Sequence, residues 1–66
     1  MKIEAVAKRL ADIRAEADDD ESAHGDEDRL WCDVLKYIAT GNCPDPQAYA
    51  IVALQTTKID FHRWCA

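Results

Sequence analysis

The residues best suited to chemistry gather in one stretch, EADDDESAHGDEDRLW, from Glu16 to Trp31. It holds eight carboxylates and one histidine in sixteen residues. Such a cluster has three interpretations: a metal site, a negatively charged surface that meets a protein partner, or the solvated start of a helix. Acidic side chains favour helix N-termini because they complement the positive end of the helix dipole. We expect a helix start, with the partner surface as the second interpretation.

Metal binding by this stretch has limited support. Glu21 and His24 have the Glu-x-x-His spacing, which places two ligands on one helical face. Di-metal bundles need two such motifs and two further glutamates, however, and this chain has one motif. Four potential ligands also follow one another at four-residue intervals, but residues in a single line along one helix do not complete a metal's coordination sphere: Asp20, His24, Asp28 and Cys32. We therefore expect His24 to hydrogen-bond a nearby carboxylate or backbone carbonyl.

A zinc site would have to combine residues that lie far apart in the sequence. The candidates are Cys43, His62 and Cys65, with either His24 or Cys32 as the fourth ligand. Structural zinc sites usually contain a Cys-x₂-Cys pair, which this sequence lacks. We predict no metal and no other cofactor, and we expect Cys32 and Cys43 to be small buried hydrophobic residues.

Neither catalysis nor nucleic-acid binding is indicated. The sequence has no glycine-rich phosphate loop, and no nucleophile has a base and an orienting acid nearby. A helix-turn-helix would use residues 46–58 for recognition, but this segment has one lysine and no arginine. The net charge of −5 also argues against binding to nucleic acids or anionic membranes. We predict a protein that is not an enzyme.

Length and composition predict one small globular domain over residues 1–66. Hydrophobic residues make up 48% of the chain, which is typical of folded rather than disordered proteins. The first residues are charged and amphipathic, unlike a signal peptide. No apolar run reaches the roughly 18 residues that a membrane span needs. We therefore expect a cytoplasmic protein with reduced cysteines.

The first predicted element is an amphipathic helix over residues 1–17. Its apolar residues recur at steps of three and four, which places them on one face: Ile3, Val6, Leu10, Ile13 and Ala17. A stripe this narrow packs in one groove, either within its own chain or on a neighbour. Because a small core supplies little stability, we favour a homodimer through this helix.

A second helix is predicted to follow the three consecutive aspartates. Asp18, with Glu21 three residues later, resembles a capping box that starts this helix. Gly25 weakens its first turns and would allow a start as late as Asp26. Gly41 is placed to take the left-handed conformation that ends a helix.

The third helix is predicted to begin with Asp45 as its N-cap and Pro46 at its first position. Its run AYAIVAL is apolar nearly all round, so we expect the most buried of the helices. Residues 56–58 end it, and Asp60 then caps one last turn over residues 61–64. The prediction is an all-α, compact three-helix domain closed by a short C-terminal helical turn.

The C-terminal residues are expected to hold the domain together. Phe61 and Trp64, three residues apart, would face the core together in a helical turn. Arg63 would point toward the start of the second helix, where Glu27 and Asp28 offer carboxylates. The alternative is an exposed hook for a partner. We predict a structural clasp with seven members: His24, Glu27, Asp28, Asp60, Phe61, Arg63 and Trp64.

Two segments carry a recognisable pattern, AHGDEDRLWCDVLKYIATG and ALQTTKIDFHRWCA. They combine an Ala-His pair, an acidic pair before a leucine, an Ile-Ala-x-Gly motif and an Ile-Asp-Phe-x-Arg-Trp ending. In these motifs the chain resembles a group of short, uncharacterised proteins encoded in tailed phages and prophages of bacteria. The likeness covers residues 23–41 and 53–66 and leaves the first helix outside. It implies a phage or prophage origin and no particular activity.

The function we expect is that of a small, acidic, non-catalytic protein that binds another protein, as an inhibitor or modulator of a host or phage factor. Acidic side chains could occupy a basic surface on that partner, and five are candidates: Asp18, Asp19, Asp20, Asp26 and Asp33. The alternative is a structural or assembly accessory that acts as a homo-oligomer. A metal-binding regulator is the third interpretation.

Overall fold

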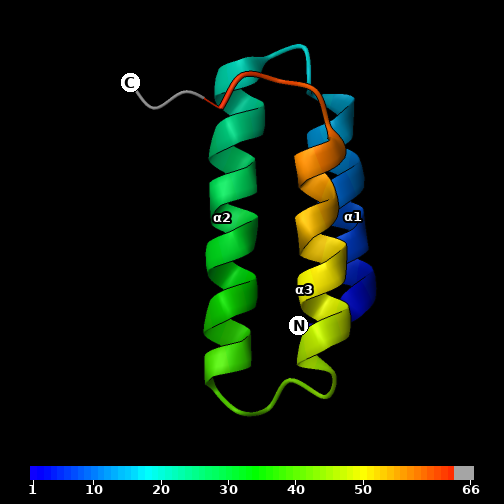
Figure 1. Cartoon of the computed structure of the whole chain (residues 1–66), viewed down its shortest axis with the longest axis vertical. Coiled ribbons are helices and arrows are strands. Elements are labelled where there is room, and N and C mark those ends of the chain that lie inside the picture. Colours follow the sequence, from blue (N-terminus) through cyan, green and yellow to red (C-terminus); the bar gives the residue numbers. More distant parts are fainter. Residues whose placement is uncertain (64–66) are drawn as a thin grey trace.

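A computed structural model of the chain describes residues 1–63 and consists of three helices (Figure 1). α1 spans Ile3–Ala15, α2 spans Asp20–Ala39 and α3 spans Pro46–Leu54. A 3₁₀ helix, η1 (Gln55–Lys58), continues directly from α3. In the view of Figure 1, α2 and α3 lie side by side and α1 lies behind α3. The all-α, three-helix fold predicted from the sequence is confirmed.

The start of α2 differs in detail from the prediction. Asp19, not Asp18, is the N-cap, and its carboxylate accepts hydrogen bonds from the Ser22 backbone N–H (3.3 Å) and hydroxyl (3.0 Å). The capping box of Asp18 with Glu21 was therefore wrong by one residue. Gly25 lies inside the helix without ending it, so α2 begins at Asp20 and not at Asp26. Ser22 offers both a backbone and a side-chain donor to Asp19, which favours this register.

The connection between α2 and α3 follows the sequence signals. Gly41 has a φ of 78°, the left-handed conformation that glycine adopts at low cost, and its N–H bonds the Ile38 carbonyl at 3.1 Å. Asp45 accepts a hydrogen bond from the Ala48 N–H at 3.0 Å, and Pro46 is the first residue of α3. The sequence predicted both the end of α2 and the start of α3 at these residues.

The hydrophobic core lies along the line where the three helices meet. Val6 and Ile13 of α1 are almost fully buried, and Ile3 and Leu10 pack beside them. The apolar stripe of α1 is thus covered within its own chain. A homodimer through this stripe would require the core to open.

By share of residues, α3 is buried to about the same degree as α2, with two buried residues of nine against four of twenty, and more than α1, with two of thirteen, but it is covered on one side only. Only Tyr49 and Ala53 of α3 are buried, whereas Ile51 is 51% exposed and Leu54 is 53% exposed. A three-helix bundle has one central core line, and each helix can turn only one side toward it. Because α3 is apolar nearly all round, its other side remains at the surface.

The C-terminal helical turn lies earlier in the chain than predicted. It is η1, over Gln55–Lys58, while residues 59–63 are not helical. The exposed Asp60 does not take the N–H of His62, which instead bonds the Asp20 carboxylate at 3.1 Å. Trp64, the second aromatic residue of the expected turn, lies outside the described residues. Within residues 1–63, no helix combines the length and apolar character needed to cross a membrane.

Candidate functional site

The clearest polar constellation joins Arg63 to Glu27, a charged residue of α2 whose surface is only 2% exposed. The Arg63 Nε donates to both carboxylate oxygens of Glu27, at 3.0 and 3.2 Å. The sequence had suggested Glu27 or Asp28 as the partner. Glu27 takes this role because it lies on the core side of α2, whereas the Asp28 side chain is 66% exposed. The Glu27 charge is thereby compensated inside the protein.

The rest of the Arg63 guanidinium binds backbone carbonyls at the C-terminal side of η1. Its Nη2 donates to the Thr56 carbonyl at 2.5 Å and to the Ile59 carbonyl at 2.8 Å, and Nη1 donates to the Phe61 carbonyl at 3.3 Å. The guanidinium also lies 3.8 Å from the centre of the buried Phe61 ring. Carbonyls at a helix end lack partners inside the helix, so Arg63 satisfies them and ties the C-terminal segment to α2.

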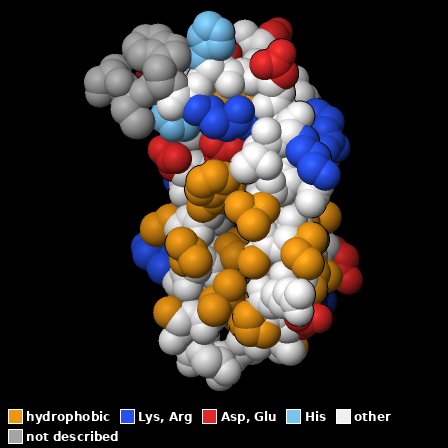
Figure 2. Space-filling model, viewed as in Figure 1, with side chains coloured by type: hydrophobic (Ala, Val, Ile, Leu, Met, Phe, Trp, Pro, Cys, Tyr) orange, Lys and Arg blue, Asp and Glu red, His pale blue; other side chains and the backbone are white. Residues whose placement is uncertain are grey.

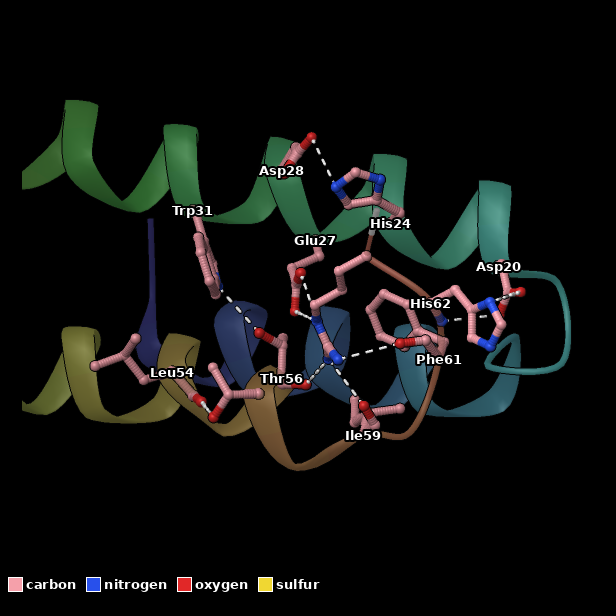
Figure 3. A network of polar contacts seen from close by, with 12 residues as sticks. Asp20, His24, Glu27, Asp28, Trp31, Leu54, Thr56, Ile59, Phe61 and His62 are labelled. Carbon is pink, nitrogen blue, oxygen red and sulfur yellow. Dashed lines mark hydrogen bonds and ion pairs between the residues drawn. The ribbon is translucent and has the colours of Figure 1, made fainter. Parts of the chain in front are cut away.

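A second contact between α2 and η1 was not predicted. The Trp31 indole N–H lies 3.0 Å from the Thr56 hydroxyl and 3.2 Å from the Ala53 carbonyl, and it donates to both. Figure 3 shows Trp31 and Glu27 pointing from α2 toward Thr56. Thr56 is fully buried. The sequence could predict only that a packed tryptophan needs a hydrogen-bond acceptor for its indole N–H. It does not identify which residue supplies that acceptor.

Four of the five aspartates expected to face a basic partner have partners within the chain. Asp19 caps α2, and Asp20 accepts the hydrogen bond from His62 and lies 3.8 Å from its ring. Asp33 pairs with Arg9 at 2.8 Å, and Asp26 pairs with Arg29. Among the described residues, Asp18 alone of the five has no polar contact of this kind. The acidic stretch is therefore largely a helix start with internal partners.

Glu16 and Asp26 form a carboxyl pair between the end of α1 and the first half of α2. Hydrogen bonding to Asp26 raises the pKa of Glu16, and partial loss of solvent adds to this effect. The same hydrogen bond lowers the pKa of Asp26, helped by a hydrogen bond from Arg29. Glu16 therefore holds a proton more readily than Asp26 does.

The metal-binding candidates are not brought together. His24 lies 3.6 Å from Asp28, one turn along α2, as Figure 3 shows, and this pair matches the carboxylate expected beside the imidazole. No group of three or more potential metal ligands occurs among residues 1–63. Cys43 is buried as expected, but Cys32 is exposed, because it lies on the outer side of α2. Cys65 lies outside the described residues.

The largest departure from the sequence interpretation is an apolar face formed by α2 and α3. Leu35 of α2 is 66% exposed, and Leu54 of α3 is 53% exposed. Leu35 and Leu54 line a hollow of about 190 Å³, whose walls also include five further apolar residues: Trp31, Val34, Ile38, Ala50 and Ala53. Figure 2 shows hydrophobic side chains gathered across α2 and α3, with charged groups toward the edges. We call this surface the α2–α3 face.

No family model matches the chain, and no curated protein or solved structure shows significant similarity to it.

Proposed function

We propose that this protein is a small non-catalytic protein that acts by binding another protein chain through the α2–α3 face. The observation that carries the proposal is the exposure of Leu35 and Leu54, which both line an apolar hollow between α2 and α3. Soluble monomers rarely expose contiguous apolar patches larger than a few hundred Å², and such patches often serve for binding. Centres of protein interfaces have this composition, with polar residues at the rim.

The chemistry of the face defines the class of partner. α3 has no charged residue from Pro46 to Leu54, and the walls of the hollow are apolar. A strongly basic surface would lose hydration there without gaining counter-charges. The partner therefore presents apolar side chains, such as one side of an amphipathic helix. This replaces the acidic surface considered from the sequence, because four of its five aspartates have partners inside the chain.

The resemblance to short phage and prophage proteins supports a bacterial setting for this binding, with a host or phage protein as the partner. The role of an assembly accessory belongs to the same proposal, since assembly also needs an apolar contact surface. A metal-binding regulator receives no support from the described residues, because their potential ligands do not cluster.

Site-specific photo-crosslinking in bacterial cells tests the proposal. A photoreactive amino acid replaces Leu35 in one variant and Ala11, an exposed residue of α1, in the control. We expect discrete crosslinked protein bands from position 35 and none from position 11. Equal crosslinking from both positions, or none from position 35, would contradict binding through the α2–α3 face.

A further inference from the structure

Trp31 belongs both to the hollow of the α2–α3 face and to the polar contacts around Thr56. Of the seven described residues that line the hollow, six are aliphatic, and Trp31 alone has a hydrogen-bond donor in its side chain. Its indole N–H donates to the Thr56 hydroxyl at 3.0 Å and to the Ala53 carbonyl at 3.2 Å. Acceptors on η1 and α3 therefore fix the orientation of the ring that forms this wall.

Thr56 is in turn connected to α2 through Arg63. Thr56 is fully buried, and its carbonyl accepts a hydrogen bond from Nη2 of Arg63 at 2.5 Å, while Nε of the same guanidinium binds Glu27 at 3.0 Å. The Ile59 N–H also donates to this carbonyl, but that bond lies within the end of η1 and does not fix Thr56 relative to α2. Glu27 and Trp31 are one turn apart on the same side of α2, and Figure 3 shows both extending toward Thr56.

These contacts form a closed path from α2 to η1 and back to α2. We call its four members the Thr56 network: Glu27, Trp31, Thr56 and Arg63. Hydrogen bonds in a buried network depend on one another, so a change at one end alters the geometry at the other. If Thr56 moves, the indole N–H loses one acceptor and the Trp31 ring can rotate toward another staggered rotamer. Such a rotation changes the shape of the hollow, because the ring is one of its walls.

We infer that Thr56 is a positioning residue for the α2–α3 face: it holds Trp31 in the orientation that shapes the hollow, and the pair of Arg63 with Glu27 holds Thr56 in place. This inference rests on the proposed function and adds how binding depends on the C-terminal segment. Tryptophan is among the residue types that contribute most to binding at interface centres, so the orientation of Trp31 affects affinity. By linkage, a partner that packs against Trp31 stabilises the contact between Arg63 and Glu27 by the same factor.

NMR of the isolated chain tests the role of Thr56 without a partner. Thr56→Val removes the hydroxyl at nearly constant volume, whereas Thr56→Ser keeps the hydroxyl and removes a methyl group. The methyl protons of Leu35 and Leu54, which line the hollow with Trp31, report the orientation of its ring through ring-current shifts. We expect these signals to move in Thr56→Val and to stay near their original positions in Thr56→Ser. Equal movement in both variants, or none in Thr56→Val, would overturn the inference.

Arg63→Lys tests the dependence on the C-terminal segment. Lysine keeps a positive charge beside Glu27, but its ammonium group lacks the planar fork that also holds the Thr56 carbonyl. We expect the two leucine methyl signals to move in the same direction as in Thr56→Val. Arg9→Lys is the matched control, because the Arg9 side chain is equally exposed and its ion pair lies outside the Thr56 network. Movement of these signals in both lysine variants, or in neither, would contradict the link to Arg63.

A measurement on the unmodified protein covers a variant that fails to fold. The indole proton of Trp31, distinguished from that of Trp64 with Trp64→Phe, should show a nuclear Overhauser effect to the Thr56 side chain, and its absence would overturn the inference. Crosslinking from position 35 separates this inference from the proposed function. Thr56→Val should reduce the crosslinked bands about fivefold, the ratio equivalent to one hydrogen bond of about 1 kcal/mol. Undiminished bands would overturn the inference alone, whereas the absence of bands from the otherwise unmodified chain would overturn the proposed function.

Discussion

Removal of the Arg63 side chain is the sharpest test of how this fold is held together. In the Arg63→Ala variant, Glu27 keeps its position on the core side of α2 but loses both hydrogen bonds from the Nε of Arg63. The carbonyls of Thr56, Ile59 and Phe61 lose the hydrogen bonds from the guanidinium in the same step. The variant thus leaves the buried charge of Glu27 without its partner and takes the guanidinium from the Ile59 and Phe61 carbonyls, whereas the Thr56 carbonyl keeps the Ile59 N–H at 3.0 Å.

The expected loss of stability is large for a domain of this size. Breaking a buried ion pair by removing one partner costs about 3–5 kcal/mol. The Arg63 side chain is 32% exposed, so water can reach part of the vacated space and we take the lower end, about 3 kcal/mol. A 66-residue core supplies about 3–5 kcal/mol in total. Arg63→Ala should therefore be close to its unfolding midpoint in water at 25 °C.

The chain provides a closely matched control in the Arg9–Asp33 pair. The Arg9 side chain is also 32% exposed, and its ion pair with Asp33 is 2.8 Å long. The difference lies in the carboxylate, because Asp33 is 45% exposed and Glu27 only 2%. Arg9→Ala should cost about 0–1 kcal/mol, as surface pairs do. Urea unfolding followed by circular dichroism measures both variants against the unmodified chain.

Two outcomes of this experiment are informative. If Arg63→Ala and Arg9→Ala shift the urea midpoint equally, burial of Glu27 does not decide the energetics and the reasoning fails. A double-mutant cycle with Glu27→Gln, which removes the buried charge at nearly constant volume, isolates the pair itself. We expect Arg63→Ala to cost less in the Glu27→Gln background, by about 0.5–3 kcal/mol.

Three further predictions concern hydrogen bonds, protons and metals. Trp31→Phe retains one aromatic ring but removes the donor to Thr56 and Ala53, so it should lower the free energy of unfolding by at least about 1 kcal/mol in urea melts. Glu16→Gln should raise the melting temperature at neutral pH. The raised pKa of Glu16 means that its charged form is disfavoured in the folded state, and glutamine mimics the protonated form. The gain should disappear as the pH falls below the ordinary value of 4.5, and a gain that persists there would refute the pairing with Asp26. Chelator treatment should leave the melting temperature unchanged, and a drop that zinc restores would refute the metal-free account.

Much of the backbone architecture could be predicted from local signals. The three- and four-residue spacing of apolar residues located α1, and Gly41, Asp45 and Pro46 marked the connection before α3. These signals work because a cap or a left-handed glycine depends on only a few neighbouring residues. The one-residue error at Asp18 arose because three consecutive aspartates can each serve as a cap, and the choice depends on which N–H they reach.

The α2–α3 face could not be predicted from the sequence. When a helix is apolar on two sides, the spacing of its apolar residues does not show which side faces the core. Residues of α3 are apolar in nearly every direction, and only the placement of α1 and α2 decides that Tyr49 and Ala53 turn inward while Ile51 turns outward. The contact of Arg63 with Glu27 could be predicted from the sequence, since both side chains needed a charged partner. Its bonds to three carbonyls depend on η1 ending beside it, which is a property of the folded chain.

The central claim is that the α2–α3 face is covered by protein when the chain functions. Thiol labelling in intact bacterial cells measures this directly, in a chain whose three cysteines are replaced by alanine. A single new cysteine is placed at Leu35 or, as the control, at Ala11. Both positions are exposed in the isolated chain. The account predicts that a maleimide reagent labels position 35 at least about tenfold more slowly than position 11 in cells, with equal rates after denaturation, because interface centres exclude water. Equal labelling rates in the folded, functioning protein would contradict it.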